Sequence, residues 1–345
     1  MRASAAVAFL SACVLVLVLV PLVRILCWRW RLLDFPGPLK IHTQPIPRLG
    51  GVAVALPISM TALFSSAQRI WPAGHFFAAL ILIWAVGLAD DLRGSPVFLR
   101  LGAQLAAGAV LWHGGWRFPA PGSGILSLVA VSIFVALFVN AFNFLDGADG
   151  VAAGVALIIA SGYLGLLSAP ALAIAATVAG ACLGFLLFNF PPASIFLGDS
   201  GSTVLGFVIA FLGLDFYSTG HVSGRPMLFP VLAAGLPLLD AALAIARRTG
   251  MRRSVFHGDR MHLYDLLLAR GVSPRRVAFT CYGITGASVV VGHLSMRLSA
   301  PPFLLLVTGS VGLLLFAEVR LGALRGDVNV DASRVRSEER TLAHR

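Results

Sequence analysis

Long apolar runs separated by short polar loops recur along almost the whole chain. A run of about 20 apolar residues matches the hydrocarbon core of a bilayer, where backbone satisfies its own hydrogen bonds only in a helix or a closed barrel. The strict alternation of a barrel strand is not visible in these runs. The pattern therefore predicts about eleven membrane-spanning helices, centred near residues 5–27, 49–66, 74–90, 96–112, 124–141, 150–168, 170–190, 201–217, 227–246, 276–296 and 301–320.

Composition supports this fold class. Of the 345 residues, 58% are hydrophobic and 12% are charged, whereas roughly 25% are charged in a soluble domain. We predict an all-α fold, a polytopic membrane helix bundle in which residues 1–322 form one domain and residues 323–345 form a polar, disordered cytoplasmic tail. The first apolar run is too long for a signal-peptide core, so we expect it to be retained as a helix. The cysteines show no C-x-x-C spacing, which gives no indication of a disulfide framework or a zinc site.

Basic residues are distributed unevenly between the two sides of the predicted bundle. The formal net charge is +11, which in a soluble protein could indicate a nucleic-acid partner. In a membrane protein the first explanation is topology, because cytoplasmic loops are enriched in Lys and Arg. If residues 33–51 are cytoplasmic, the basic residues left outside are Arg2, Arg69, Arg117, Arg225 and Arg297. We predict an external N-terminus, a cytoplasmic C-terminus and no nucleic-acid partner.

The aspartates are also unevenly distributed. Before residue 300 the chain has ten Asp and no Glu. Carboxylates near a membrane are costly unless they are paired, hydrated or bound to a cation. With the topology above only Asp215 lies away from the cytoplasmic side, where the others gather: Asp34, Asp90, Asp91, Asp146, Asp149, Asp199, Asp240, Asp259 and Asp265. Loops far apart in the sequence are therefore expected to form one site.

Two of these loops supply candidate catalytic residues. The segment KIHTQPIPRLGG holds Lys40, the only Lys in the chain, and a compact ammonium suits phosphate neutralisation where a planar guanidinium would not. Chance is the alternative explanation for a single Lys. The segment GLADDLRG holds Asp90 and Asp91, which repel each other unless one is protonated or both contact a cation. This pair indicates a metal or proton-transfer role, the alternative being a solvated helix end neutralised by Arg93.

Two further loops supply candidate metal and substrate ligands. In NAFNFLDGADG, Asn and Asp recur every third position, which on a helix places them along one face: Asn140, Asn143, Asp146 and Asp149. Ordinary turn chemistry is the alternative. In FNFPPASIFLGDSGS, Asp199 stands at the start of a predicted span, where it could hold a metal ion or only cap the helix. Mg²⁺ takes one or two protein carboxylates and completes its shell with water and phosphate oxygens.

A fifth loop, residues 247–275, is rich in Arg. Arg253 and Arg260 could grip a diphosphate, or could only be the positive charge of a cytoplasmic loop. Carboxylates, amides and Arg on one cytoplasmic face indicate an anionic, metal-bound substrate, and the membrane setting indicates a lipid co-substrate. We expect Mg²⁺ as the cofactor, with Mn²⁺ as an alternative.

At these residues the sequence resembles the polyprenyl-phosphate N-acetylhexosamine-1-phosphate transferases, over about residues 30–270 and with the motifs in family order. The resemblance implies transfer of a sugar 1-phosphate from a UDP-sugar to undecaprenyl phosphate, with release of UMP, in the bacterial cytoplasmic membrane. It also implies that Asp199 holds Mg²⁺ beside Asn143, that Asp90 and Asp91 are essential, and that a uridine pocket includes Phe196. Together with the loops above, the candidate substrate-binding residues are Asn143, Asp146, Asp149, Asn189, Phe196, Arg253, Arg260 and His262.

The fifth loop departs from the family pattern. Family members carry a His-rich cluster where this chain reads HLYD, so only His262 remains, followed by Tyr264 and Asp265. N-acetylglucosamine 1-phosphate is the expected group, because about eleven spans fit that branch of the family. The expected role is the first membrane step of cell-envelope polysaccharide synthesis. Another UDP-N-acetylhexosamine or UDP-N-acetylmuramoyl-pentapeptide stays open as the donor, and a homodimer stays open as the oligomeric state.

Other mechanisms and protein classes fit the sequence less well. We expect direct attack of the lipid phosphate on the phosphorus that bears the sugar, with a covalent Asp intermediate as the alternative. A secondary transporter would place ionisable residues near mid-bilayer on broken helices, often in repeated halves. Here the middles of the spans are almost free of charge and no convincing repeat is visible. A CDP-alcohol phosphotransferase would need its Asp cluster on one short run.

Overall fold

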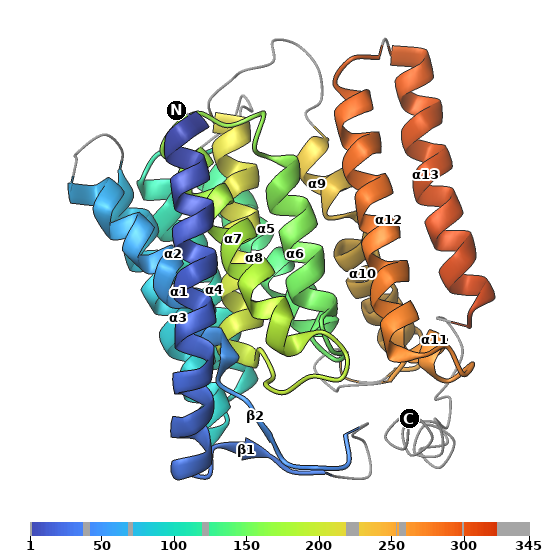
Figure 1. The fold of residues 1–345 in the computed structure, drawn as a ribbon. Coiled ribbons are helices and arrows are strands. Elements are labelled where there is room, and N and C mark those ends of the chain that lie inside the picture. The colour runs from blue at the N-terminus through green and yellow to red at the C-terminus, as the bar shows by residue number, and fades with distance from the viewer. Residues whose placement is uncertain are drawn as a thin grey trace.

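A computed structural model describes residues 2–36, 42–67, 72–118, 124–218, 228–252, 254, 260–298 and 300–322. This part of the chain forms a helix bundle with one small two-stranded sheet (Figure 1). The longer helices are α1 Arg2–Arg29, α2 Gly50–Ala67, α3 Ala73–Arg93, α4 Val97–His113, α5 Gly124–Leu145, α6 Val151–Gly162, α7 Ala171–Asn189, α8 Asp199–Ser218, α10 Gly235–Gly250, α12 Pro274–Ser295 and α13 Ala300–Arg320. The shorter elements are α9 Phe229–Ala233, α11 Leu263–Leu268 and the antiparallel strands β1 Leu33–Asp34 and β2 Ile46–Pro47.

The α-helical membrane fold predicted from the apolar runs is confirmed. Six helices of the described residues are both long and apolar enough to cross a bilayer, namely α1, α3, α5, α7, α8 and α12. Shorter apolar helices fill most of the remaining predicted spans, including α2, α4 and α6. The protein is therefore an integral membrane protein, while the number of spans and their orientation in the cell stay predictions.

One predicted span has a different structure. Residues 227–246 form two helices, α9 and α10, with a break at Ala234. Pro237 has no N–H to donate to the carbonyl four residues earlier, and Gly235 is a poor helix former, so the helix cannot continue through this point. The second helix, α10, buries Asp240 and Arg247 together with its apolar side chains. This segment thus buries Asp240, which the sequence places on the cytoplasmic side, together with Arg247 from the start of the fifth loop.

Helix α8 lies at the centre of the bundle. Every residue from Ser200 to Phe216 is buried, as expected for a helix that is apolar on all sides. It packs against α2, α3, α5, α6, α7 and α9. The contacts with α2 and α3 are close, because a Cβ on Gly51 would overlap the backbone of Gly201 and one on Gly87 would overlap the first turn of α8. The N-terminus of α8 is consequently held tightly by both neighbours.

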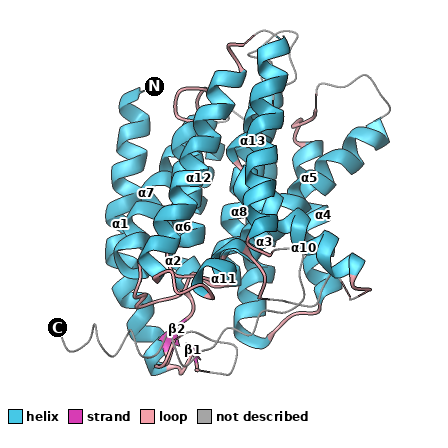
Figure 2. Ribbon diagram, turned by 90° about the vertical axis from the view of Figure 1, so that its right-hand side faces the viewer, coloured by secondary structure: helices cyan, strands magenta, loops and turns pink. Residues whose placement is uncertain are grey.

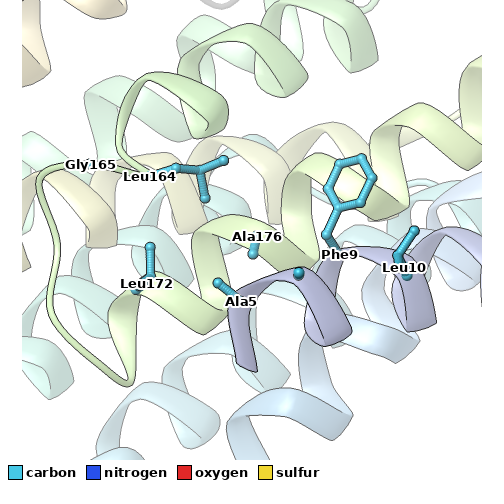
Figure 3. Close-up of a pocket in the computed structure, with 8 residues that line it drawn as sticks. Ala5, Phe9, Leu10, Leu164, Gly165, Leu172 and Ala176 are labelled. Atoms are coloured by element: carbon cyan, nitrogen blue, oxygen red, sulfur yellow. The ribbon is translucent and has the colours of Figure 1, made fainter. Parts of the chain in front are cut away.

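An apolar pocket lies between the N-terminal half of α1, the start of α7 and the turn after α6 (Figure 3). Its volume is about 620 Å³, and its lining includes Phe9, Leu10, Leu164 and Leu172. The lining has no charged side chain that could bind a phosphate or a metal ion. Figure 1 places this half of α1 at the end of the bundle opposite to β1, β2 and α11. The candidate site described below therefore lies elsewhere.

Both views show the C-terminal helices α12 and α13 side by side at the edge of the bundle (Figure 1 and Figure 2). Helix α12 also packs against α6, α9 and α10. Among the described elements, the main packing partners of α13 are α12 and α10. The exposed apolar side chains of α13 include Leu313 and Phe316. They are suited to face lipid, which is the environment that the sequence predicts for this helix.

The predicted orientation can be tested with single cysteines at exposed positions. We expect Thr43→Cys and Arg93→Cys to react with a membrane-impermeant maleimide only from the cytosolic side, and His113→Cys only from the opposite side. The matched control is the unaltered protein, whose four cysteines lie in helices. Labelling of Thr43→Cys and Arg93→Cys from different sides would contradict a shared face.

Candidate active site

The first turn of α8 is anchored by a carboxylate from α3. Asp91 Oδ1 accepts the N–H of Asp199 and Asp91 Oδ2 accepts the N–H of Ser200, both at 2.9 Å. The first N–H groups of a helix have no partner within the helix, and negative charge is stabilising there. Gly198 precedes this turn with a φ of 75°, and a Cβ on it would overlap the Asp91 carboxylate and the carbonyl of Arg48. Asp91 therefore sets the position at which Asp199 begins α8.

The carboxylate of Asp199 points away from its own helix, towards α4 and α5. Asn143 of α5 donates from Nδ2 to Asp199 Oδ1 at 2.7 Å, and the same nitrogen lies 3.2 Å from Ser202 Oγ. Arg100 of α4 donates from Nη1 to Asp199 Oδ2 at 3.3 Å. The sequence left open whether Asp199 only caps α8. The structure gives the capping role to Asp91 and leaves the Asp199 side chain in contact with polar groups of two other helices.

The side chain of Asp90, the neighbour of Asp91, contacts Arg100 of α4. Arg100 Nη1 donates to Asp90 Oδ2 at 2.8 Å, and the backbone N–H of Ser95 donates to Asp90 Oδ1. One guanidinium nitrogen therefore joins Asp90 to Asp199. The sequence pattern does not single out Arg100, because an Arg in the first turn of a helix on the cytoplasmic side also satisfies the positive-inside rule.

The Asn and Asp stripe predicted on one helical face is divided by the end of α5. Helix α5 ends at Leu145, so Asn140 and Asn143 lie on it while the two Asp lie in the turn that follows. Asn140 donates to Gln104 Oε1 of α4 at 2.6 Å. The four residues are equally spaced in the sequence but do not share one helical face. Only the two Asn lie on α5, and the two Asp lie beyond its last turn, where helical periodicity no longer applies.

Asp146, in the turn after α5, lies close to the first turn of α8. The backbone of Gly198 lies near its carboxyl group and acts to lower its pKa. Removal from bulk water, followed by the negative charges of Asp199, Asp91 and Asp149, raises the pKa of this carboxyl well above the usual range. Several carboxyl groups from three loops are thus near enough to raise the cost of one another's ionisation, and a cation at this point would lower that cost.

Asp149 and Asn189 bind backbone. Asp149 Oδ2 accepts the N–H of Ala193 at 2.9 Å, while burial raises its pKa despite that bond and the nearby His42. Asn189 is 4% exposed, and its amide accepts the N–H of Gly150 and donates to the carbonyl of Ile195. Both residues therefore fasten the segment 190–198 to the start of α6, and their predicted contact with uridine stays a prediction.

Phe196 contacts β2 and His42, a residue that precedes β2. Its backbone donates to Pro47 and accepts from Gly50, and its ring centroid lies 5.2 Å from that of His42 in an edge-on arrangement. His42 is held by Asp34 Oδ2 at 2.8 Å. His42 was not indicated by the sequence pattern, and its contact becomes visible only when the first and fourth loops are brought together.

The fifth loop is fixed by Asp240 of α10. Asp240 Oδ2 lies 2.6 Å from His262 Nδ1, and Asp240 Oδ1 accepts the N–H of Leu263 at 2.9 Å. Both side chains of the Asp240 and His262 pair are about as buried as the core. Burial also raises the pKa of Asp265 to about 6, against the effect of His262 and Arg260. Asp240, on the helix that follows the break at Ala234, therefore holds His262, the one His of the HLYD segment.

Tyr264 connects the fifth loop to the end of α5. Its ring is stacked on that of His262, and its hydroxyl donates to the carbonyl of Phe144 at 3.1 Å. A Cβ on Gly147 would overlap this hydroxyl, so only glycine leaves room for it. Tyr264 thus occupies the space beside the turn that carries Asp146.

Two predicted site residues, Lys40 and Arg253, lie outside the described residues. Arg260 begins the described stretch of the fifth loop at residues 260–275, and it lies near Asp265. The oxygen donors Asp90, Asp199 and Asn143 suit a hard cation such as Mg²⁺, which needs only one or two protein carboxylates. In the part of the chain that the structure describes, no group of three or more His, Cys, Asp or Glu is placed so that it could hold a metal ion by itself. These residues therefore fit Mg²⁺ that takes its other ligands from water and substrate.

Fold and site together define an α-helical integral membrane protein with a carboxylate-rich site where four segments meet. A family model described as glycosyl transferase family 4 matches residues 74–217, which extend from the first turn of α3 to the last turn of α8. The chain belongs to this family, which confirms the predicted resemblance.

Relatives match over most of the chain. A decaprenyl-phosphate N-acetylglucosaminephosphotransferase of Mycolicibacterium smegmatis is 34% identical over 303 residues, covering 75% of this chain and 74% of that protein. A probable undecaprenyl-phosphate N-acetylglucosaminyl 1-phosphate transferase of Bacillus subtilis is 28% identical over 295 residues, covering 80% of each. A phospho-N-acetylmuramoyl-pentapeptide-transferase of Moorella thermoacetica is 31% identical over 256 residues, covering 63% of this chain and 74% of that protein.

The two adjacent carboxylates are expected to respond differently to substitution. Asp91→Asn leaves one acceptor oxygen for two N–H groups of α8, so we expect it to lower the free energy of unfolding by about 1–3 kcal/mol. The matched control is Asp90→Asn, whose partner Arg100 is partly exposed and whose effect on unfolding is expected to be smaller. Thermal unfolding of both purified variants in detergent measures the difference, and equal stability of the two variants would contradict the anchoring role of Asp91.

Proposed function

We propose that this protein transfers N-acetylglucosamine 1-phosphate from UDP-N-acetylglucosamine to undecaprenyl phosphate, with release of UMP, at the cytoplasmic face of the bacterial inner membrane. The observation that carries the proposal is the meeting of Asp90, Arg100, Asn143 and Asp199, from four helices, at the start of the buried helix α8. A site of this kind can bind a metal ion and two anionic phosphates. The names of the M. smegmatis and B. subtilis relatives support the sugar and the polyprenyl phosphate acceptor.

The lipid phosphate and the sugar nucleotide are both anions, so they react only after their charges are neutralised. Mg²⁺ held by Asp199, with Asp90 close by, would supply neutralisation and Lewis-acid activation of the diphosphate. Asn143 holds the Asp199 carboxylate in one orientation through its amide. Arg100 adds a positive charge between α3 and α8, and Lys40 is assigned the neutralisation of a phosphate.

We favour a single displacement. An oxygen of the lipid phosphate attacks the phosphorus that bears the sugar, a new phosphate anhydride bond forms, and the bond to the UMP oxygen breaks. Phosphoryl transfer needs positioning and electrostatic stabilisation from the protein more than covalent chemistry. Burial of Asp91 against the α8 backbone supports this view, because its two oxygens are already engaged by N–H groups. It is thus a positioning residue and not a nucleophile.

The proposed reaction is tested by incubating the purified protein with undecaprenyl phosphate, Mg²⁺ and a panel of labelled UDP-sugars. A labelled lipid and UMP are expected with UDP-N-acetylglucosamine. A product only with UDP-N-acetylmuramoyl-pentapeptide would move the protein to the reaction named for the M. thermoacetica relative. No lipid product with any donor would contradict the proposal.

Asp199→Asn is expected to abolish transfer, because a neutral amide lacks the negative charge and one of the two ligand oxygens that a carboxylate offers to Mg²⁺. Removal of divalent cations by EDTA should likewise abolish the activity of the unaltered protein, and addition of Mg²⁺ or Mn²⁺ should restore that activity. Two folding controls are elution of the variant at the same volume as the unaltered protein on size-exclusion chromatography in detergent, and an unchanged melting temperature. Wild-type turnover in Asp199→Asn would remove this residue from the metal site.

Lys40→Arg keeps the positive charge but replaces a compact ammonium with a larger planar group. We expect specific activity to fall at least about tenfold, roughly 1.4 kcal/mol of transition-state stabilisation, and to fall further in Lys40→Ala. The measurement is lipid transfer normalised to folded protein. Near wild-type activity in Lys40→Arg would show that the lone Lys is not required for phosphate neutralisation.

A further inference from the structure

Arg100 is placed between two carboxylates that belong to different helices. Its Nη1 lies 2.8 Å from Asp90 Oδ2 and 3.3 Å from Asp199 Oδ2. The helices α3 and α8 are held together independently by the bonds from Asp91 to the α8 backbone. The bridge by Arg100 is therefore not needed to keep the two helices in contact. The position of a guanidinium between two carboxylates needs another explanation.

The remaining hydrogen bonds of these carboxylates show which oxygens are bound to Arg100 and which to other groups. Asp199 Oδ1 accepts from Asn143, and Asp90 Oδ1 accepts from the backbone of Ser95. The two Oδ2 atoms are the ones that share the guanidinium. A cation that contacts Asp199 and Asp90 together would approach these same two oxygens. A guanidinium has only donors and a fixed positive charge, so it competes with such a cation for position and by charge repulsion.

The Arg100 side chain is able to leave this position. It is 31% exposed, as is Asp199, whereas Asp90 is 11% exposed. Among the described residues, Nη1 is the guanidinium nitrogen that donates hydrogen bonds, and the longer of its two bonds is to Asp199. Moving the guanidinium therefore breaks few contacts, and a partly exposed ion pair contributes little to stability.

We infer that Arg100 is the resident counter-ion of Asp90 and Asp199, and that a divalent cation displaces it when the metal binds. This inference rests on the metal role of Asp199 in the proposed function. The displaced guanidinium stays beside the site on the first turn of α4, where an incoming phosphate is the next anion that it can contact. The exchange would keep the carboxylates neutralised before the metal arrives and would provide a cation for the anionic substrate afterwards.

The test uses Mn²⁺ as the probe and the full-length protein in detergent, without sugar nucleotide or lipid. Free Mn²⁺ is measured by electron paramagnetic resonance. Arg100→Gln removes the competing charge, so we expect Mn²⁺ to bind about tenfold more tightly. Arg100→Lys keeps the charge and is the matched control, with affinity close to that of the unaltered protein. Asp199→Asn identifies the site, because the Mn²⁺ binding under study should be lost there.

Weaker or unchanged Mn²⁺ binding by Arg100→Gln would overturn the inference, because it would show that Arg100 arranges the carboxylates for the metal and does not compete with it. A second measurement needs no variant. Phenylglyoxal modification of Arg100 in the unaltered protein, followed by mass spectrometry of its peptide, should become faster when Mn²⁺ is added. Slower or unchanged modification would also overturn the exchange.

These measurements are separate from the proposed reaction. Metal binding and arginine modification are recorded without substrates, so a protein that failed the lipid-transfer assay could still show the exchange. Conversely, active protein in which Arg100→Gln binds Mn²⁺ less tightly would leave the proposed reaction intact and remove only the inference about Arg100. In the transfer assay Arg100→Gln is expected to lose activity despite its tighter metal binding, since the cation for the phosphate is absent.

Discussion

The carboxylate of Asp91 at the N-terminus of α8 is the interaction on which the rest of the site depends. It binds two backbone N–H groups of a helix that is buried on all sides. Glycines at the crossings with α2 and α3 let the backbones approach closely enough for these bonds to form. The direction in which Asp199 leaves α8 follows from this contact, and the positions of Asn143 and Arg100 relative to Asp199 follow in turn.

A second constraint is the accumulation of negative charge beside that turn. The charges of Asp91, Asp149 and Asp199 act on Asp146 and raise the pKa of its carboxyl. Such repulsion is relieved by a proton on one of the carboxyl groups or by a cation beside them. The structure places the Arg100 guanidinium between the carboxylates of Asp90 and Asp199. The proposed function requires this site to bind a metal ion and two phosphates, and the exchange inferred for Arg100 would provide a cation for each stage.

The region of the fifth loop shows how a departure from the family pattern is accommodated. Tyr264 stands where the resemblance leads one to expect another His, and it uses its hydroxyl to bind the carbonyl of Phe144. Asp240 holds His262 from α10, a helix that exists because the apolar run breaks at Ala234. The fifth loop is thus joined to the end of α5, and Tyr264 lies directly beside Gly147 in the turn that carries Asp146.

The sequence by itself determined the α-helical membrane fold, most helix positions, and the family, because apolar run length and motif order are local properties of the chain. It also indicated that Asp90, Asp91, Asn143 and Asp199 belong to one site. Only the tertiary structure decided that Asp91 binds backbone while Asp90 faces Arg100. The physical reason is that hydrogen bonds depend on the direction of each side chain across a helix crossing, and residue spacing within one helix carries no information about the partner helix.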